Sequence, residues 1–391
     1  MLKQIEGSQA VADVVALCRP NVIAAYPITP QTHIVEDLAA IVSEGRLKAE
    51  FVNVESEFAA ASVVLGASAA GARTYTATTS QGMLLMNEVI YCIAGMRLPI
   101  VLTCANRSIA APLNIWNDHQ DSMSVRDAGW IQLHAEDNQE AADLHIQAYK
   151  IAEQLSLPVM VCMDGFILTH AYEPVDIPDQ KQVDDFLPPF KPTHIVDPRW
   201  PRGLGLYADP RFYMEVKYIQ HRALEKSEKT IKQVSSDFNR AFNRDSGGLF
   251  KTYKLKDADV VIVSMGSIVG SIKDLIDRLE ANGKKVGLLQ ICSFRPFPRK
   301  EIYKTLKDKT NIVVIEKAVS LGRGGILASD IRWSFPKGEK TKRRISSFIA
   351  GLGGRNISLD DLQYMVEKVE REPVELEFLG LRQEIIQEKD L

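Results

Sequence analysis

Several polar side chains in this sequence come directly after apolar runs, and the first of them lies in a proline-rich loop. The stretch AAYPITPQTH encloses Thr29 between Pro27 and Pro30. Proline cannot donate a hydrogen bond to a sheet and disfavours helical geometry in the residue before it, so the apolar run must end in a stiff turn. Thr29 is then either the cap of the following helix or a rigid hydroxyl aimed at a ligand, and both interpretations stay open here.

Two carboxylates begin the next segment of this kind, NVESEFAAASVVLGASAAGA. Glu55 and Glu57 end a strand and start a helix, where the helix dipole favours acidic side chains. The Ala, Ser and Gly residues behind them allow another backbone or a flat ligand to approach closely. A buried carboxylate at this place could therefore serve in proton transfer.

Hydroxyl groups end a third strand in ATTSQGMLLMNE. Thr78, Thr79 and Ser80 come just before Gly82 and an apolar helix. Such hydroxyls either cap the helix or form hydrogen bonds with a ligand, and the sequence leaves the two alternatives open.

Arg107 follows the apolar run LPIVLT and has no acidic residue close to it in the sequence. Its guanidinium group offers paired donors that suit a carboxylate or a phosphate, and the alternative is an ion pair with a distant Asp or Glu. The same stretch contains Asn114 and the run NDHQD, which is more typical of a hydrogen-bond network than of a metal site. We expect no metal ion to be bound by this chain.

These four stretches require a framework of alternating strands and helices. Strands are predicted at 21–27, 48–54, 72–79, 98–106, 130–135 and 157–165, and helices at 7–19, 30–42, 56–71, 81–95 and 138–155. Strands that alternate with helices of this length form a mostly parallel sheet covered on both faces. Open sheets of this type bind ligands at the carboxyl ends of their strands, which is where the four stretches lie.

The alternation stops between about residues 176 and 250 and then resumes. The first part of this connecting segment is dense in proline and charge, and 220–244 has the pattern of a charged, solvated helix. Beyond it, strands are predicted at 258–267, 284–294, 311–318 and 343–354, and helices at 268–283 and 299–308. The prediction is a first domain over 1–250, including the connecting segment, and a second α/β domain over 251–391. Its LGRGG and GLGGRN stretches lack dinucleotide-binding spacing and predict turns.

The composition is that of an ordinary globular protein. The 391 residues are 46% hydrophobic and carry a net charge of −3, which gives no electrostatic basis for nucleic-acid binding. The sequence has no run of roughly 18 apolar residues and no signal-peptide pattern, so we expect a cytoplasmic protein without a membrane span. The five cysteines are isolated, which argues against a disulfide framework or an iron–sulfur cluster held by this chain alone.

The order of the motifs is more specific than any one of them. YPITP, ESEFAA, TTSQGMLLM and LPIVLTCANRSIAAPLNIWNDHQD resemble the α subunit of the pyruvate:ferredoxin oxidoreductase family, the thiamine-diphosphate-dependent 2-oxoacid:ferredoxin oxidoreductases. FRPFP, VIEKAVSLGRGG and IAGLGGRNIS extend the resemblance over nearly the whole chain. It implies two doubly wound, mostly parallel-sheet domains: a pyrimidine-binding domain for thiamine diphosphate and a transketolase C-terminal-like domain.

The resemblance also implies roles for individual residues. Glu57 matches the glutamate that hydrogen-bonds the aminopyrimidine ring and thereby promotes formation of the cofactor carbanion, with Glu55 as the less favoured candidate. Arg107 matches the arginine expected to bind the 2-oxoacid carboxylate, and Thr29 matches a threonine that faces substrate and cofactor.

Four further residues match positions close to the same site. Pro27, Ser80 and Gln81 are expected to contact the cofactor, and Asn114 is expected to contact the substrate.

The activity implied is oxidative decarboxylation of pyruvate to acetyl-CoA and CO₂, with electrons passed to ferredoxin, as in anaerobic metabolism. The expected partners are a β subunit that holds the diphosphate and Mg²⁺, γ and δ subunits of which one is ferredoxin-like, and ferredoxin itself. The [4Fe-4S] clusters are expected on these partners, and the enzyme is expected to be a hetero-oligomer.

Three alternatives remain at this stage. The substrate could be another 2-oxoacid or oxalate, although Thr29 stands where a basic residue could neutralise the second carboxylate of oxalate, unless Arg97 or a partner supplies that charge. The chain could also be a non-catalytic assembly subunit, or part of a transketolase-like transferase without electron transfer.

Overall fold

The computed structural model describes residues 2–193, 195–201, 203–336 and 342–387. The chain divides into two compact units, Met1–Lys251 with Ile291–Pro298, and Thr252–Gln290 with Arg299–Leu391. The segment Ile291–Pro298 departs from the predicted boundary, because β12 (Ser293–Arg295) pairs with a strand of the first unit.

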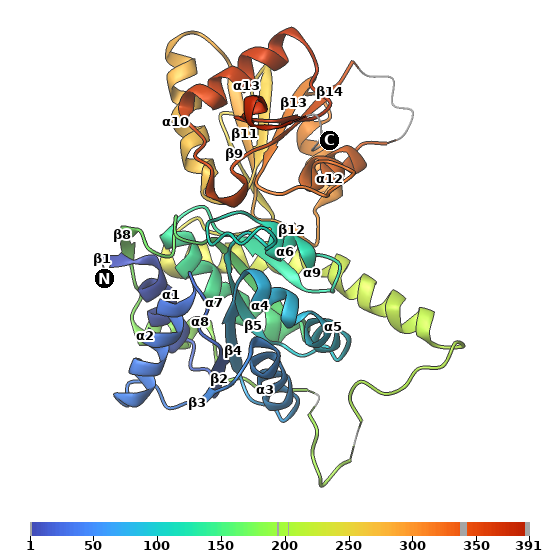
Figure 1. Cartoon of the computed structure of the whole chain (residues 1–391). Helices are drawn as coiled ribbons and strands as arrows, with labels where there is room; N and C mark the ends of the chain where they lie inside the picture. Colours follow the sequence, from blue (N-terminus) through green and yellow to red (C-terminus); the bar gives the residue numbers. More distant parts are fainter. Residues whose placement is uncertain (1, 194, 202, 337–341, 388–391) are drawn as a thin grey trace. The chain divides into compact units, whose positions relative to one another are not determined.

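Seven strands form the main sheet of the first unit (Figure 1). Their spatial order is β12, β6 (Ile131–His134), β7 (Val159–Asp164), β5 (Val101–Asn106), β4 (Thr74–Thr78), β2 (Val22–Ala25) and β3 (Glu50–Asn53). All neighbours are parallel except β12 with β6. The predicted α/β class with a mostly parallel sheet is confirmed, and the six parallel strands lie inside their predicted ranges.

Helices cover both faces of this sheet, and a separate apolar cluster fills each side. One cluster involves α1 (Gly7–Leu17), α2 (Thr32–Ser43), α7 (Asn138–Leu155), α8 (Gln180–Phe186) and α9 (Tyr213–Phe242), and the other involves α3 (Glu57–Ala69) and α5 (Asn87–Gly95). Along β7, Val159 and Val161 belong to the first cluster, whereas Met160 and Cys162 belong to the second. This alternation follows from the two-residue repeat of a strand and defines a doubly wound fold.

The single helix predicted over 81–95 is instead two helices. α4 (Ser80–Leu85) and α5 are joined at Met86, which is fully buried and keeps right-handed backbone angles (φ −75°, ψ −10°). The apolar pattern is continuous across this joint, so periodicity alone gave no sign of it.

The solvated helix predicted in the connecting segment is wrong for its C-terminal half. Ile231, Val234, Phe238 and Phe242 of α9 are buried in the first cluster, and the rings of Phe238 and Phe242 stack 4.3 Å apart. Their spacing of three and four residues makes one apolar stripe on a highly charged helix. The stripe attaches the C-terminal half of α9 to the first unit.

A small antiparallel pair, β1 (Leu2–Glu6) with β8 (Tyr172–Asp176), was not predicted. It joins the start of the chain to the segment that follows β7. Glu6 is thereby brought towards residues far from it in the sequence.

The second unit contains a six-stranded sheet, in the order β15 (Glu377–Phe378), β14 (Arg344–Ile349), β13 (Asn311–Glu316), β10 (Val260–Ser264), β11 (Val286–Ile291) and β9 (Phe250–Tyr253). Its helices are α10 (Ile268–Ala281), α11 (Arg299–Leu306), α12 (Ile326–Ser334) and α13 (Leu359–Arg371). The turns predicted in the two glycine-rich stretches are present, with positive φ at Gly322, Gly324 and Gly351.

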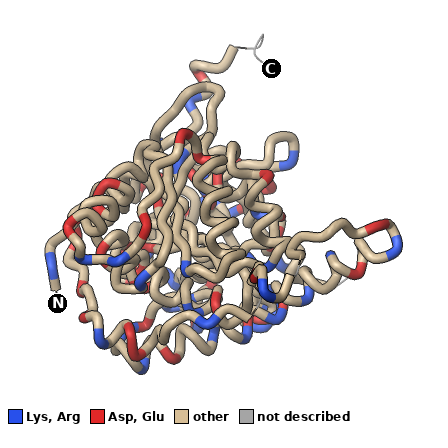
Figure 2. Tube along the Cα trace, turned by 90° about the horizontal axis from the view of Figure 1, so that it is seen from below, with Lys and Arg blue, Asp and Glu red and all other residues tan. Residues whose placement is uncertain are grey.

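Charge and hydropathy are distributed without large single-sign or apolar segments. In the view of Figure 2, Lys and Arg are interspersed with Asp and Glu along the trace. None of the helices in the described residues combines the length and the apolar character that crossing a bilayer requires.

Candidate active site

The order of the strands defines where a ligand should bind to the first unit. The chain passes from β2 outwards to β3 and then returns to the other side of β2 to form β4 and β5. The carboxyl ends of β2 and β4 therefore flank the point at which the winding direction changes. Open α/β sheets bind ligands in the crevice at such a point.

The loop after β2 is fixed by a buried glutamine. The Gln31 side chain is fully buried, and its Nε2 donates to the carbonyl of Ala77 at 2.7 Å and to that of Tyr26 at 3.3 Å. Its Oε1 accepts from the backbone N–H of Ile28 at 3.3 Å. One side chain therefore joins the proline-rich loop to β4, a role that sequence reasoning did not assign to it.

Thr29 is exposed at the tip of this loop, and Pro27 is exposed beside it. The interpretation of Thr29 as a helix cap is wrong, because α2 begins at Thr32 and its N-cap is Gln31. Among the described residues the Thr29 hydroxyl has no hydrogen-bond partner. The alternative of a rigid hydroxyl available to a ligand is therefore the one that the geometry supports.

Arg107 lies against this loop from the end of β5. It is 7% exposed, and its Nη1 donates to the Thr29 carbonyl at 2.8 Å while its Nε donates to the Asn114 carbonyl at 3.2 Å. No carboxylate in the described parts of the chain forms an ion pair with its guanidinium group, so the expected alternative of a distant Asp or Glu partner is not observed. Burial lowers the pKa of Arg107 from its usual value, and the charge of Asp121 opposes that shift. The group remains a cation with donors to spare.

Asp121 organises the backbone around Arg107. This fully buried carboxylate accepts from the backbone N–H groups of Arg107 and Ser80, both at 2.9 Å, and from the Asn106 side chain at 2.8 Å. The ends of β4 and β5 are thereby held by one anion. Asp121 is the last residue of the NDHQD run, and the sequence analysis assigned no separate role to it.

The hydroxyls at the end of β4 do not cap α4. Thr79 is the N-cap residue, but its Oγ1 donates to the Ala105 carbonyl at 2.5 Å and makes no capping bond. Ser80 adopts a positive φ of 50° and donates to the Ser108 carbonyl and to Gln81 Oε1, the latter at 2.6 Å. These residues join β4 to the loop after β5, so of the two alternatives the capping one is wrong.

Two polar atoms of the same turn are left without partners. Thr78 Oγ1 and Gln81 Nε2 are buried and have no hydrogen-bond partner among the described residues. Buried polar groups are normally paired, and these two atoms lie at the carboxyl end of β4, where a ligand could supply the missing partner.

Glu57 begins α3 and faces the same turn. It is 7% exposed, and none of the described residues donates a hydrogen bond to its carboxylate, whereas Glu55 is exposed. A Cβ atom on Gly82 would lie 2.8 Å from Glu57 Oε1 and 2.4 Å from Thr78 Oγ1. Only glycine allows the start of α4 to approach the carboxylate this closely. Burial thus favours Glu57 over Glu55 as the functional acid.

The loop after β5 is a hydrogen-bond network. Asn114 Oδ1 accepts from Ser108 Oγ at 2.8 Å and from the Trp116 N–H at 2.7 Å, and His119 Nε2 lies 2.6 Å from Asp164 Oδ1. Asn114 thus shapes the loop that supports Arg107.

The structure brings the predicted residues into two connected groups. Thr29, Arg107 and Asn114 form one group through direct contacts, and Ser80 and Gln81 are joined to it through Asp121. Glu57 contacts the turn between β4 and α4 rather than Arg107. Within the described residues, the chain therefore presents a buried acid at the start of α3 without a hydrogen-bond donor, and a cation after β5 without a carboxylate partner.

Arg97 is excluded as a second cation at this site. Its guanidinium donates to the carbonyls of Ser156 at 2.8 Å and Leu155 at 2.6 Å, at the C-terminal end of α7. This end leads into β7, so Arg97 lies at the amino ends of the strands, opposite the ends that carry the site.

Comparison with family models gives two matches. Residues 13–236 match the model described as "Pyruvate flavodoxin/ferredoxin oxidoreductase, thiamine diP-bdg". Residues 258–362 match "Pyruvate:ferredoxin oxidoreductase core domain II".

Curated relatives match over nearly their full lengths. The chain is 46% identical over 391 residues to the pyruvate synthase subunit PorA of Methanosarcina barkeri, covering 98% of this chain and 97% of the relative. It is 49% identical over 375 residues to PorA of Methanocaldococcus jannaschii, with 95% of each chain covered. The ketoisovalerate oxidoreductase subunit VorA of Pyrococcus horikoshii is 39% identical over 370 residues, with 94% of each chain covered.

Solved structures share the fold at low identity. A 2-oxoglutarate:ferredoxin oxidoreductase from Magnetococcus marinus matches with a TM-score of 0.72 and 20% identity, covering 94% of this chain and 65% of that chain. A split-gene transketolase matches with a TM-score of 0.54 and 13% identity, covering 94% and 98%. The family-model and sequence matches show more than the fold, and they place this chain in the pyruvate:ferredoxin oxidoreductase family, as its motifs predicted.

Proposed function

We propose that this chain is the α subunit of a 2-oxoacid:ferredoxin oxidoreductase that converts pyruvate to acetyl-CoA and CO₂ and passes the electrons to ferredoxin. The observation that carries the proposal is the Arg107 guanidinium, which is buried at the change in winding direction and has no carboxylate partner among the described residues. A group of this kind suits an anionic substrate.

Arg107 has the donors that a 2-oxoacid carboxylate needs. Arginine carries five N–H groups, and two of them donate to the carbonyls of Thr29 and Asn114, which leaves three for a ligand. The two carbonyls fix the plane of the guanidinium group without neutralising its charge. The exposed hydroxyl of Thr29 lies on the same loop and can bond to the 2-oxo group or to the cofactor.

The residues around Glu57 fit the aminopyrimidine half of thiamine diphosphate. In the part of the chain that the structure describes, the buried carboxylate has no hydrogen-bond donor, and Thr78 Oγ1 and Gln81 Nε2 nearby have no partner. Glu57 would hold a proton at a ring nitrogen, Gln81 and Ser80 would orient the ring, and the Gly82 turn would admit its flat face. The cofactor itself, when bound, supplies the nucleophilic carbon that attacks the 2-oxo group.

The identities of the relatives support pyruvate over other 2-oxoacids. The pyruvate synthase subunits are 43–49% identical to this chain, and the ketoisovalerate subunit is 39% identical. Oxalate is disfavoured because Thr29 stands at the loop tip and Arg97 bonds to the end of α7 instead.

Partner subunits complete this proposal. The first unit is assigned as the pyrimidine-binding domain and the second as the transketolase C-terminal-like domain. A β subunit would hold the diphosphate and Mg²⁺. The [4Fe-4S] clusters would lie on the β and ferredoxin-like subunits and would pass electrons to ferredoxin, with γ and δ subunits or fused equivalents completing the assembly. A cytoplasmic location also stays a prediction.

The test is to purify the chain with its co-expressed partner subunits and to measure viologen reduction with pyruvate, 2-oxoglutarate, 2-oxoisovalerate and oxalate, each with and without coenzyme A. We expect pyruvate to be oxidised fastest and to require coenzyme A. Oxidation of oxalate without coenzyme A, at a rate above that of pyruvate, would contradict the substrate assignment.

A Glu57→Gln variant tests the cofactor half of the proposal. It keeps the shape of the side chain but cannot hold a proton as a carboxylate does, so turnover should fall at least about 100-fold, in the range typical of general acid–base residues. Glu55→Gln is the matched control, because Glu55 is exposed two residues earlier. Equal turnover in the two variants, with cofactor bound, would remove Glu57 from this role.

A further inference from the structure

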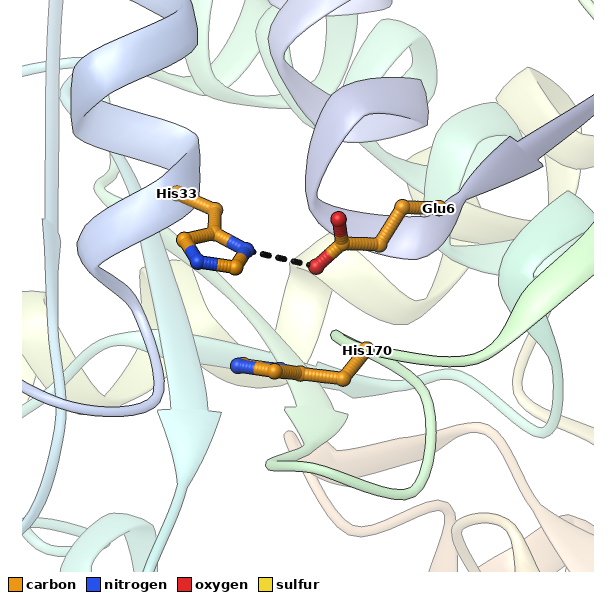
Figure 3. A group of neighbouring side chains, drawn as sticks. All are labelled: Glu6, His33 and His170. Carbon is orange, nitrogen blue, oxygen red and sulfur yellow. Dashed lines mark hydrogen bonds and ion pairs between the residues drawn. The ribbon is translucent and has the colours of Figure 1, made fainter.

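Glu6, His33 and His170 form a side-chain cluster that the proposed reaction does not use. Glu6 ends β1, His33 lies in the first turn of α2, and His170 lies between β7 and β8. In Figure 3 the Glu6 carboxylate and the His33 ring face each other across a hydrogen bond, and the His170 ring lies alongside them. The potential ligand atoms of the three side chains all lie within 4.8 Å of each other. Among the described residues this is the one group of three such side chains. The residues are too far apart in the sequence for a motif search to detect them.

His170 is held in a fixed orientation. Its Nδ1 lies 2.7 Å from Thr169 Oγ1, and Thr169 Oγ1 in turn accepts from the Phe166 N–H at 2.8 Å. The imidazole ring stacks on that of His33 with centroids 4.8 Å apart and also contacts the Phe166 ring at 4.8 Å. Metal-bound histidines usually have the second ring nitrogen hydrogen-bonded in this way, which here leaves Nε2 as the ligand atom.

The charges around the cluster favour a cation. His33 Nδ1 lies 2.7 Å from Glu6 Oε1, and the carboxylates of Glu36 and Asp37 add negative charge close to His33. The cluster therefore combines two imidazole rings with nearby negative charge.

We propose that Glu6, His33 and His170 bind a divalent transition-metal ion, with zinc as the best match. Two imidazole nitrogens and one carboxylate oxygen are a ligand set that zinc accepts, with water completing a tetrahedron. The ion would take the place of the proton between His33 and Glu6. Because the His33 and His170 rings stack on each other, the His33 ring, which is 46% exposed, would turn out of this stack so that both nitrogens face one ion.

Such an ion would connect three segments that lie beside the loop carrying Thr29. A Cβ atom on Gly165 would lie 2.5 Å from Pro30 Cγ, so the segment that follows β7 packs directly against that loop. His33 follows Pro30 closely in the sequence, and His170 follows Gly165, so both histidines lie near this contact. The expected role is therefore structural: the ion ties the starts of α1 and α2 to the segment between β7 and β8.

The test is a titration of the metal-free full-length chain with zinc chloride, followed by competition with a chromophoric chelator, in a Cys92→Ser background. Cys92 is the one exposed thiol, so its removal eliminates thiolate binding at the surface. We expect one ion per chain, a rise in melting temperature, and cobalt d–d absorption without a thiolate charge-transfer band.

Variants separate this site from adventitious binding. His170→Ala and Glu6→Gln should each weaken zinc affinity at least about tenfold, as loss of even an outer ligand partner does. His221→Ala is the control, because His221 is an exposed histidine on α9 beside Glu225, and it should leave the affinity unchanged. Circular dichroism of the metal-free variants checks that they fold.

Two outcomes would overturn the proposal. One is zinc affinity that is the same in His170→Ala, Glu6→Gln and the background protein. The other is an absence of stoichiometric zinc binding in the background protein at micromolar concentrations, which would leave the cluster as a hydrogen-bonded acid–imidazole pair.

Discussion

Replacement of Arg107 is the most direct probe of the proposed substrate site. In Arg107→Ala the substrate carboxylate loses a charge-assisted interaction, and hydrogen bonds to charged groups are worth about 1.5–3 kcal/mol. This corresponds to an increase in the KM for pyruvate of about 10- to 150-fold. Arg107→Lys keeps the charge but replaces the planar fork by a single ammonium group, so we expect a smaller increase.

The structure also indicates how loss of the guanidinium could act indirectly. Its Nη1 and Nε hold the carbonyls of Thr29 and Asn114 at 2.8 and 3.2 Å, so its removal loosens two loops. Asn114→Ala loosens the loop after β5, since it removes the acceptor for Ser108 Oγ and the Trp116 N–H, but it leaves the guanidinium in place. Comparison of the two variants separates binding by the cation from support of the loop.

The assay is steady-state viologen reduction by the assembled enzyme, with pyruvate and coenzyme A varied separately. We expect Arg107→Ala to raise the KM for pyruvate while the KM for coenzyme A stays within twofold. Arg46→Ala, which removes an exposed partner of Glu44, is the surface control. An unchanged KM for pyruvate in Arg107→Ala, or an increase no larger than that in Asn114→Ala, would refute the assignment of Arg107 to the substrate.

Three further predictions follow from the packing around the site and the core. Gly82→Ala should lower stability by about 1–3 kcal/mol, because its Cβ would meet Glu57 Oε1 at 2.8 Å; thermal melting should show no such loss for Gly66→Ala, whose Cβ meets nothing within 4 Å. Gln31→Leu should cost about 1–3 kcal/mol in denaturant melts and should also raise the KM for pyruvate, since the Ile28 N–H and the Ala77 carbonyl lose their partner; an unchanged KM would mean that the loop does not depend on Gln31. Burial lowers the pKa of His145 from 6.5 to about 4, so the folded protein should lose roughly 3 kcal/mol of stability as the pH falls from 6.5 towards 4. His145→Phe should flatten this part of the plot of unfolding free energy against pH. An unchanged slope in the variant would contradict the prediction.

The framework of the fold could be predicted because its determinants are local. Strands such as Val101–Asn106 and Val159–Asp164 are apolar runs that are buried on both faces, and each is bounded by turn residues. The packing of α9 against the first unit could not be predicted from local sequence in this way. The apolar residues Ile231, Val234 and Phe238 of α9 are separated by many charged residues in the sequence. Their burial depends on contacts with the core of the first unit, which the local sequence does not show.

The sequence named candidate residues for contact with a ligand, but it did not identify the residues that hold those candidates in position. Thr29, Glu57 and Arg107 stand at the ends of strands, where their residue types alone left alternatives open, and the resemblance to a family supplied their expected roles. Asp121 and Gln31 bond mainly to backbone groups that become neighbours only when β2, β4 and β5 align. A side chain that fixes distant backbone has no local signature.

This difference bears on how the site distinguishes one substrate from another. In the proposed function Arg107 binds the 2-oxoacid carboxylate. The position of Arg107 is set by Asp121, which accepts from its backbone N–H, and by the Thr29 carbonyl, which accepts from its side chain. Thr29 thus contributes its carbonyl to the cation and leaves its hydroxyl available. A basic residue at position 29 would place a second positive charge beside a guanidinium that has no carboxylate partner among the described residues. A dianionic substrate would relieve the repulsion between two such cations, so under the proposed function we expect Thr29 to favour a monocarboxylate such as pyruvate.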